Sequence, residues 1–93
     1  MAIRSFRSPH TEAIYEGESP KRFGNNENIA QRKLQMLDAA VELSDLNSPP
    51  GNQLEALSGN RMGQHSVRIN NQWRVCFVWT DAGPEDLEIV DYH

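Results

Sequence analysis

Residues 57–79, LSGNRMGQHSVRINNQWRVCFVW, contain two stretches with the two-residue period of half-buried β-strands. In residues 65–70, Val67 and Ile69 alternate with polar side chains. In residues 73–79, one face carries Trp73, Val75, Phe77 and Trp79, and the other carries Arg74, Cys76 and Val78. The stretch predicts an antiparallel hairpin whose apolar face packs against another layer of the protein.

Two helices are predicted ahead of this hairpin. Ser8 and Pro9 form an N-cap followed by proline at the first helical position, so a helix of about two turns is expected over residues 10–16. A second helix is expected over residues 29–42, which contain no glycine or proline. Its apolar stripe, suited to packing on a sheet, consists of Ala30, Leu34, Leu37 and Val41. The residues outside the stripe, interpreted as solvated, are Arg32, Lys33, Gln35 and Asp38.

Three further segments have strand character. Residues 2–6 and 52–57 are each predicted as a short strand, residues 81–85 as a turn, and residues 87–92 as the last strand. The predicted fold class is α+β, an antiparallel sheet with two helices on one face. The 93 residues are expected to form a single domain.

Charge and cysteine content indicate how the protein could meet nucleic acid and in which compartment it is expected. The net charge of −4 argues against non-specific adhesion to nucleic acid, but residues 58–80 carry three arginines and no acidic residue. The single cysteine, Cys76, cannot form an intramolecular disulfide and is interpreted as a buried, inert thiol. No apolar stretch is long enough to span a membrane and no signal peptide is present, so a cytoplasmic protein is expected.

Arg61, Arg68 and Arg74 are the first candidates for a functional site. A guanidinium group matches phosphate oxygens and can stabilise the charge that develops on a phosphorane. The alternative for any one of these arginines is a structural ion pair with Asp91 or Glu55.

The histidines and the C-terminal tripeptide are the second group of candidates. Histidine titrates near neutrality, so His65 is either a site residue or a surface residue, while His10 is interpreted as exposed. Asp91-Tyr92-His93 combines groups that can orient, donate and accept protons. The three histidines show no recurrent spacing, and no dinucleotide or phosphate-loop motif occurs, so no metal or cofactor is expected.

The segment PPGNQLEALSGNRMGQHSVRINNQWRVCFVW, followed by LEIVDYH, resembles the HigB-type killer proteins of bacterial toxin–antitoxin systems, in the RelE/ParE superfamily. The resemblance is dense over the C-terminal half, and the N-terminal half agrees in length and in its two helices. It implies a compact RelE-like fold and a toxin that enters the ribosomal A site and cuts mRNA without a metal. It also implies a HigA-like helix-turn-helix antitoxin as partner, through which alone the toxin would reach operator DNA.

The resemblance also implies roles for individual residues. Arg74 would bind phosphate and stabilise the transition state, and Asp91, Tyr92 and His93 would form a C-terminal catalytic group. The residues expected to contact RNA are Arg61, Arg68, His65 and Glu55.

Two features depart from the family pattern. Ribosome-dependent relatives carry a histidine and a lysine at the positions of Glu55 and Ser58, so Glu55 as a carboxylate base or His65 would have to replace the histidine. Such toxins are also usually basic, whereas the isoelectric point here is about 5.2. Two alternatives therefore remain open: a non-enzymatic ParE-like toxin that inhibits a protein such as DNA gyrase, and a degenerate toxin that acts as a binding partner.

Overall fold

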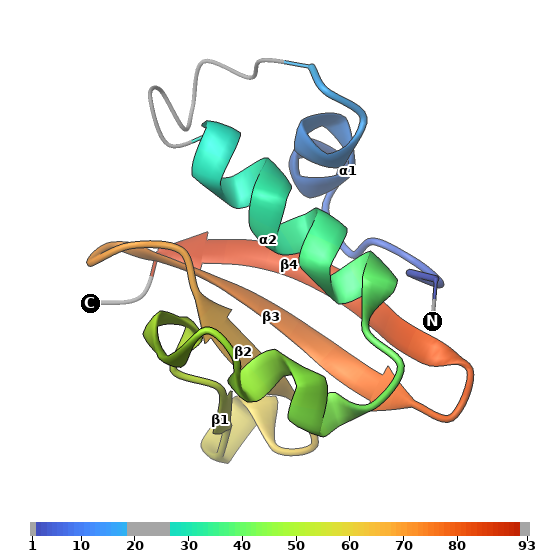
Figure 1. Ribbon diagram of the computed structural model, residues 1–93, viewed down its shortest axis with the longest axis vertical. Coiled ribbons are helices and arrows are strands. Elements are labelled where there is room, and N and C mark those ends of the chain that lie inside the picture. The colour runs from blue at the N-terminus through green and yellow to red at the C-terminus, as the bar shows by residue number, and fades with distance from the viewer. Residues whose placement is uncertain (1, 19–26, 92–93) are drawn as a thin grey trace.

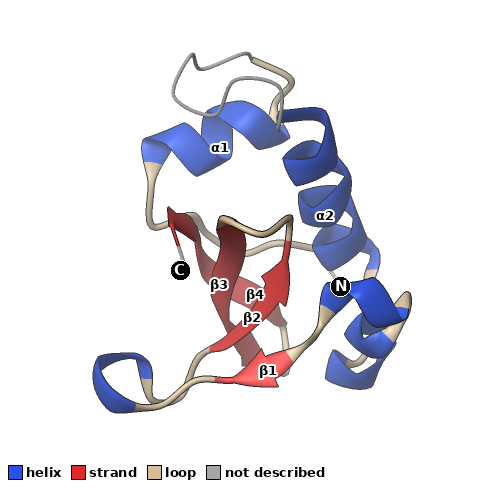
Figure 2. Cartoon of the chain, turned by 90° about the vertical axis from the view of Figure 1, so that its left-hand side faces the viewer, coloured by secondary structure: helices blue, strands red, loops and turns tan. Residues whose placement is uncertain are grey.

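A computed structural model describes residues 2–18 and 27–91 of the chain. The helices are α1 (Pro9–Tyr15) and α2 (Glu27–Ala39), followed by three short 3₁₀ helices, η2 (Leu43–Asn47), η3 (Pro50–Asn52) and η4 (Gly59–Arg61). The strands are β1 (Glu55–Ala56), β2 (His65–Arg68), β3 (Trp73–Thr80) and β4 (Gly83–Asp91). All neighbouring strands pair antiparallel in the order β1-β2-β3-β4, and α1 and α2 lie on the same side of the sheet (Figure 1, Figure 2). The α+β class with two N-terminal helices on one face is confirmed.

The core lies between the helices and the sheet. Ile14 from α1 and Leu34 and Leu37 from α2 are buried against the sheet. The sheet contributes the alternating side chains that the sequence predicted, which are Val67, Ile69, Trp73, Val75, Phe77, Leu87 and Ile89. Burial of these apolar side chains is the main force that holds the two layers together.

Hydrogen bonds also join the layers. The side chain of Ser8 caps α1 by accepting a hydrogen bond from the Thr11 N–H, as the sequence predicted. Thr11 is itself fully buried, and its Oγ1 accepts a hydrogen bond of 3.0 Å from the Ile89 N–H of β4. This backbone donor points away from the sheet toward α1, so a side chain has to satisfy it.

The second helix is shorter than predicted. It ends at Ala39, and Val41, which the sequence placed in the apolar stripe, is 64% exposed. The Asp45 carboxylate accepts hydrogen bonds from the N–H groups of Val41 and Glu42 and thereby starts the separate helix η2. The same two hydrogen bonds lower the pKa of Asp45 below its usual value.

Three strand boundaries also differ from the prediction. Residues 2–6 do not form a strand; Phe6 makes one parallel bridge to Leu87, and backbone hydrogen bonds from Arg4 and Arg7 follow the edge of β4. In place of a strand over residues 52–57, only Glu55–Ala56 pairs with β2. The last strand begins at Gly83 rather than at residue 87, and only residues 81–82 of the predicted turn over 81–85 form a turn. An irregularity in the β3–β4 pairing, with Asp86 at φ 56°, lets the strand continue from Gly83 through Asp86.

The sheet face opposite the helices carries the polar side chains. Directly opposite residues in an antiparallel pair project to the same side, and Glu55, Ser66, Cys76 and Glu88 form one such row across the four strands. Arg68, Arg74 and Val90 form the neighbouring row. We call this surface the polar face; it is defined by Glu55, Ser66, Arg68, Arg74, Cys76 and Glu88.

Candidate functional site

Arg74 is the most buried charged side chain of the polar face, with only 6% of its surface exposed. Its Nε donates a hydrogen bond of 2.8 Å to the Ser66 hydroxyl. Its Nη2 donates to two backbone carbonyls, those of Ser66 and of Gln53 in the segment before β1. The guanidinium is therefore fixed by β2 and by the segment before β1, so little further side-chain entropy would be lost if it bound a ligand.

Glu55 approaches the same guanidinium from β1. Its Oε1 lies 3.7 Å from Arg74 Nε, and 49% of the Glu55 side chain is exposed to solvent. The structural ion pair that the sequence allowed for one arginine is thus present at Arg74. Because the carboxylate is half in water, the pair neutralises Arg74 only in part and contributes at most about 1 kcal/mol to stability.

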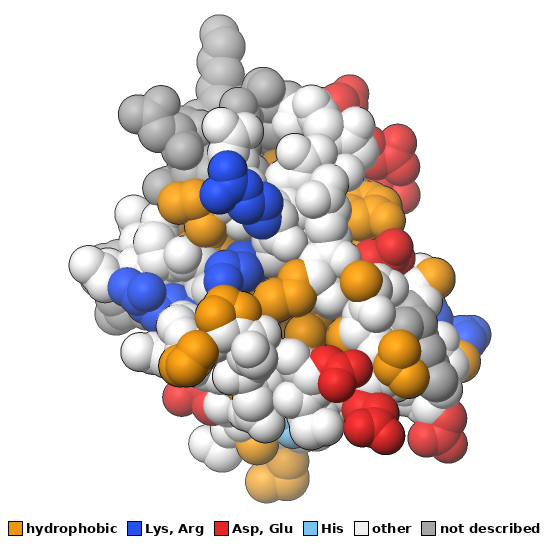
Figure 3. Space-filling model, viewed as in Figure 1, with side chains coloured by type: hydrophobic (Ala, Val, Ile, Leu, Met, Phe, Trp, Pro, Cys, Tyr) orange, Lys and Arg blue, Asp and Glu red, His pale blue; other side chains and the backbone are white. Residues whose placement is uncertain are grey.

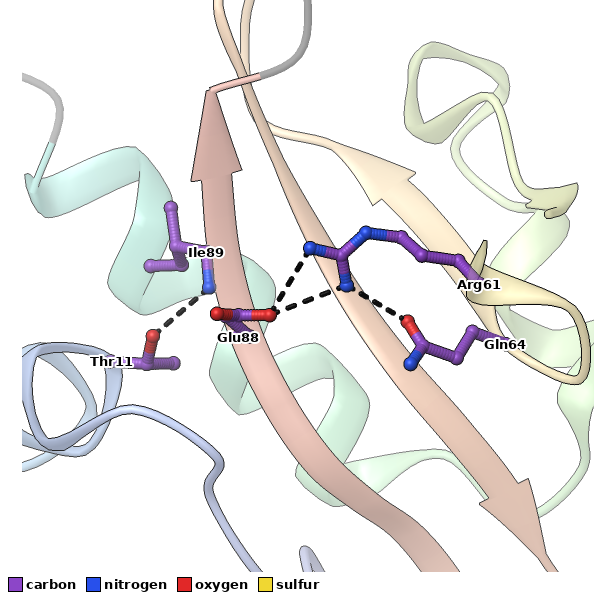
Figure 4. Close-up of polar contacts among 5 residues, drawn as sticks. All are labelled: Thr11, Arg61, Gln64, Glu88 and Ile89. Carbon is purple, nitrogen blue, oxygen red and sulfur yellow. Dashed lines mark hydrogen bonds and ion pairs between the residues drawn. The ribbon is translucent and has the colours of Figure 1, made fainter. Parts of the chain in front are cut away.

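Arg61 belongs to a different cluster on this face. Both of its terminal nitrogens lie 3.3 Å from Glu88 Oε1, and Nη1 also donates to the Gln64 side chain at 3.1 Å (Figure 4). Figure 4 shows the side chain reaching from η4 across the sheet to β4. Arg61 was predicted to contact RNA; here its charge is balanced by Glu88, and the pair ties η4 to the sheet.

Cys76 lies in the row between Ser66 and Glu88 and has no exposed surface. Burial raises the pKa of its thiol, an effect that Arg61 and Arg74 partly offset and Glu88 reinforces. The thiolate, which is the nucleophilic form, is therefore disfavoured. The predicted buried cysteine is confirmed.

Arg68 is placed directly opposite Arg74 in the β2–β3 pairing. Its Nη2 donates a short hydrogen bond to the Asn71 side chain in the connection between the strands. Two like charges at directly opposite positions of a sheet destabilise it. The Arg68–Arg74 row is therefore a position where an anion would be stabilising.

His65 is on the other face of the sheet from Arg74, so the structure does not support it as a contact in the same site. It pairs directly with the core residue Phe77, and the two rings are stacked with centroids 6.3 Å apart. Its Nδ1 is buried and accepts or donates no hydrogen bond within the described residues. His65 faces the core because alternate residues of a strand project to the same side, and His65 alternates with the core residues Val67 and Ile69.

Asp91, the first residue of the C-terminal candidate group, is the last residue of β4. Asp91 pairs with Trp73, one position beyond the Val90–Arg74 pair, and its carboxylate accepts a hydrogen bond of 3.1 Å from the Gln72 side chain. By alternation Asp91 projects to the face of Trp73, not to the polar face. Tyr92 and His93 are outside the described residues.

The structure thus brings Glu55, Arg68 and Arg74 together, sets Arg61 in an adjacent ion pair and separates His65 from them. Sequence reasoning missed Ser66 and Glu88, which complete these two clusters. Both sit on the polar side of alternating strands, which was the available signal, but their partners depend on strand register. In residues 2–18 and 27–91 no group of three histidine, cysteine or acidic side chains could hold a metal ion, and no helix is long and apolar enough to cross a membrane.

The fold is similar to that of solved structures. A chain of the YoeB-YefM complex from Staphylococcus aureus superposes with a TM-score of 0.61 at 22% identity, covering 100% of this chain and 99% of that one. This similarity supports the compact α+β fold expected for a RelE-like protein.

Sequence comparison then gives the family. Residues 4–93 match the family of HigB-like toxins, described as the RelE-like toxin of type II toxin-antitoxin system HigB. Toxin HigB-1 of Vibrio cholerae is 44% identical over 84 residues, covering 88% of this chain and 87% of the relative. Endoribonuclease HigB of Proteus vulgaris is 33% identical over 92 residues, covering 98% and 99%. The chain belongs to the HigB-like family of RelE-like toxins.

Proposed function

We propose that this chain is an endoribonuclease toxin that cuts mRNA on the ribosome and is restrained by a cognate antitoxin. The relative named Endoribonuclease HigB supports the activity, since it matches nearly the whole chain. The observation in the structure that carries the proposal is the Arg74 guanidinium, fixed by Ser66 and Gln53 and directly opposite a second arginine. This arrangement suits a phosphodiester anion.

In the proposed reaction a base removes the proton of the ribose 2′-OH, and O2′ attacks the adjacent phosphorus. The bond to the 5′-oxygen breaks, that oxygen takes a proton from an acid, and a 2′,3′-cyclic phosphate and a 5′-hydroxyl remain. Arg74 binds the phosphate and stabilises the charge on the phosphorane. Preset donors of this kind are effective because they need no reorganisation during the reaction.

The acid and base are assigned to the C-terminal group Asp91, Tyr92 and His93. This assignment is supported by the family resemblance of the DYH ending. Glu55, at 3.7 Å from Arg74 Nε, is assigned a positioning role.

The proposed partner is a HigA-like antitoxin with a helix-turn-helix domain, and the proposed location is the cytoplasm, where ribosomes and mRNA are found. The family description, a toxin of a type II toxin-antitoxin system, supports an antitoxin partner. The structural relative from Staphylococcus aureus is likewise a member of a toxin–antitoxin complex.

The test is to add the purified chain to translating ribosomes programmed with a defined mRNA. We expect cleavage of the mRNA that depends on the ribosome. DNA supercoiling by gyrase, measured in parallel, should be unaffected. Intact mRNA together with inhibited supercoiling would contradict the proposal and favour a ParE-like toxin.

A further inference from the structure

Two cations lie at the edge of the sheet where the short strand β1 leaves β2 unpaired. Arg68 is the last residue of β2, and Lys33 extends from α2. The Lys33 ammonium donates a hydrogen bond to Asn52 Oδ1 of η3, the short helix that contacts β2 beyond the end of β1. Lys33, interpreted from the sequence as a solvated residue, is half-buried at this position.

The Asn52 side chain holds Lys33 in place. It has no exposed surface, and its Nδ2 donates to the backbone carbonyls of Leu46 at 3.1 Å and Ser48 at 3.2 Å. Because the amide nitrogen is used by these carbonyls, the amide oxygen is turned toward the ammonium. Because the hydrogen bonds of the buried Asn52 amide are satisfied, its oxygen has a fixed position. This oxygen holds the Lys33 ammonium in one place, unlike the ammonium of a lysine that is free in solvent.

Lys33 and Arg68 are held by neutral groups rather than by acids. Lys33 bonds to the Asn52 amide and Arg68 to the Asn71 amide. Within the described part of the chain, the ion pairs with carboxylates are formed by Arg61 and Arg74 instead. The positive charges of Lys33 and Arg68 are therefore not neutralised there by a carboxylate.

The two charges are also close enough to affect each other. Burial lowers the pKa of Lys33, and the positive charge of Arg68 lowers it further. Arg68 in turn faces Arg74 across the β2–β3 pair. Figure 3 shows most of the visible Lys and Arg side chains on the left of the molecule and most of the visible acidic side chains to the right and below.

We propose that Lys33 and Arg68 form a second phosphate-binding subsite, which holds an RNA phosphodiester beyond the one bound by Arg74. An RNA phosphate would supply the negative charge that no carboxylate of the described residues supplies to Lys33 and Arg68. The arginine offers a planar fork and the lysine a point charge, and both bind phosphate oxygens. The inference rests on the proposed function, because it assumes that the ligand is RNA.

The test measures binding of a short 2′-O-methyl RNA, which has no free 2′-hydroxyl to attack the phosphate, at several salt concentrations. The full chain is compared with Lys33→Gln and Arg68→Gln, in which an amide replaces the charge. For each variant we expect weaker binding and a slope of log affinity against log salt that is smaller by about 0.7, the value for one phosphate contact to a single strand. Lys33→Arg, which keeps the charge, should retain the wild-type slope.

Arg7→Gln is the matched control. Arg7 is exposed and hydrogen-bonds through its backbone to β4, at the opposite edge of the sheet from Lys33. The Arg7→Gln substitution also removes one positive charge, so it shows how much RNA binding changes from the loss of net charge alone. Thermal unfolding of each variant verifies that the fold is retained.

The outcomes separate the subsite from the proposed function. Slopes and affinities of Lys33→Gln and Arg68→Gln equal to those of Arg7→Gln would overturn the subsite, even if the wild-type chain cleaves mRNA. Reduced slopes in a chain that does not cleave mRNA would support the subsite and reject the proposed function.

Discussion

The Arg74 Nε donates to the Ser66 hydroxyl and lies 3.7 Å from the Glu55 carboxylate, and Nη2 donates to two backbone carbonyls. A residue fixed in this way is part of both the fold and the site. Its geometry is set by the pairing of β1, β2 and β3, so a phosphate that reaches the polar face meets a donor already in position. This is the physical basis for assigning transition-state stabilisation to Arg74 rather than to Arg61, whose charge is balanced by Glu88.

Glu55→Gln distinguishes a positioning residue from a general base. Glutamine keeps an oxygen that can accept a hydrogen bond from Arg74 but loses the charge. Since a half-exposed ion pair contributes about 0–1 kcal/mol, the rate of RNA cleavage should fall by roughly tenfold or less, with an unchanged pH profile. Single-turnover cleavage measured across pH provides the comparison. A loss of about 10²-fold or more with the basic limb altered would identify Glu55 as the base.

At the scale of secondary structure, the helices were predictable because each carries its own signals. Ser8 and Pro9 mark the start of α1, and the apolar spacing marks the buried side of α2. The end of α2 was missed because the apolar spacing continues to Val41, whereas the Asp45 carboxylate binds the N–H groups of Val41 and Glu42 and starts η2 there. The start of β4 was missed because Gly83 and Pro84, which usually signal a turn, are accommodated at an edge strand.

The contact between α1 and β4 can be tested through Thr11. Thr11→Val keeps the shape of the side chain but leaves the Ile89 N–H without its acceptor. Because this donor is buried, we expect the free energy of unfolding to fall by about 1–3 kcal/mol, measured by urea denaturation. Thr11→Ser retains the hydroxyl and should lose less stability. Equal midpoints for the two variants would show that the hydrogen bond contributes little.

The C-terminal end of β4 is the second element to test. His93→Ala, and separately deletion of Tyr92 and His93, should abolish growth inhibition on expression while folding and antitoxin binding remain intact. The reason is that these residues are proposed to move protons and not to support the core. Growth inhibition that survives the deletion would show that the acid and base lie elsewhere.

For the whole molecule, the fold class and the position of the arginines followed from alternation and helical periodicity alone. The composition of the site did not follow in the same way. Whether Arg74 meets Ser66 and Glu55, or Arg61 meets Glu88, depends on strand register and on where η4 places the Arg61 side chain. Lys33 was interpreted as solvated because its packing partner, Asn52, belongs to an irregular segment with no periodic signal.

The structure also shows how charged side chains are distributed over one face of the molecule. A net charge of −4 is unusual for a protein proposed to bind RNA, but on the face drawn in Figure 3 most of the acidic side chains lie to the right and below, and most of the Lys and Arg side chains lie to the left. Local field governs the approach of an anionic ligand more than total charge does. A negative net charge is therefore compatible with the RNA contacts proposed for Arg68, Arg74 and Lys33.

The most direct test of the account is the single-turnover rate of mRNA cleavage on the ribosome by Arg74→Ala, compared with the wild-type chain and with Arg61→Ala. The Arg74 variant should lose on the order of 10²-fold or more in rate, because it removes a preset transition-state contact, whereas Arg61→Ala should lose much less. Thermal unfolding establishes that both variants are folded. A folded Arg74→Ala that cleaves at the rate of Arg61→Ala would contradict the assignment of transition-state stabilisation to Arg74.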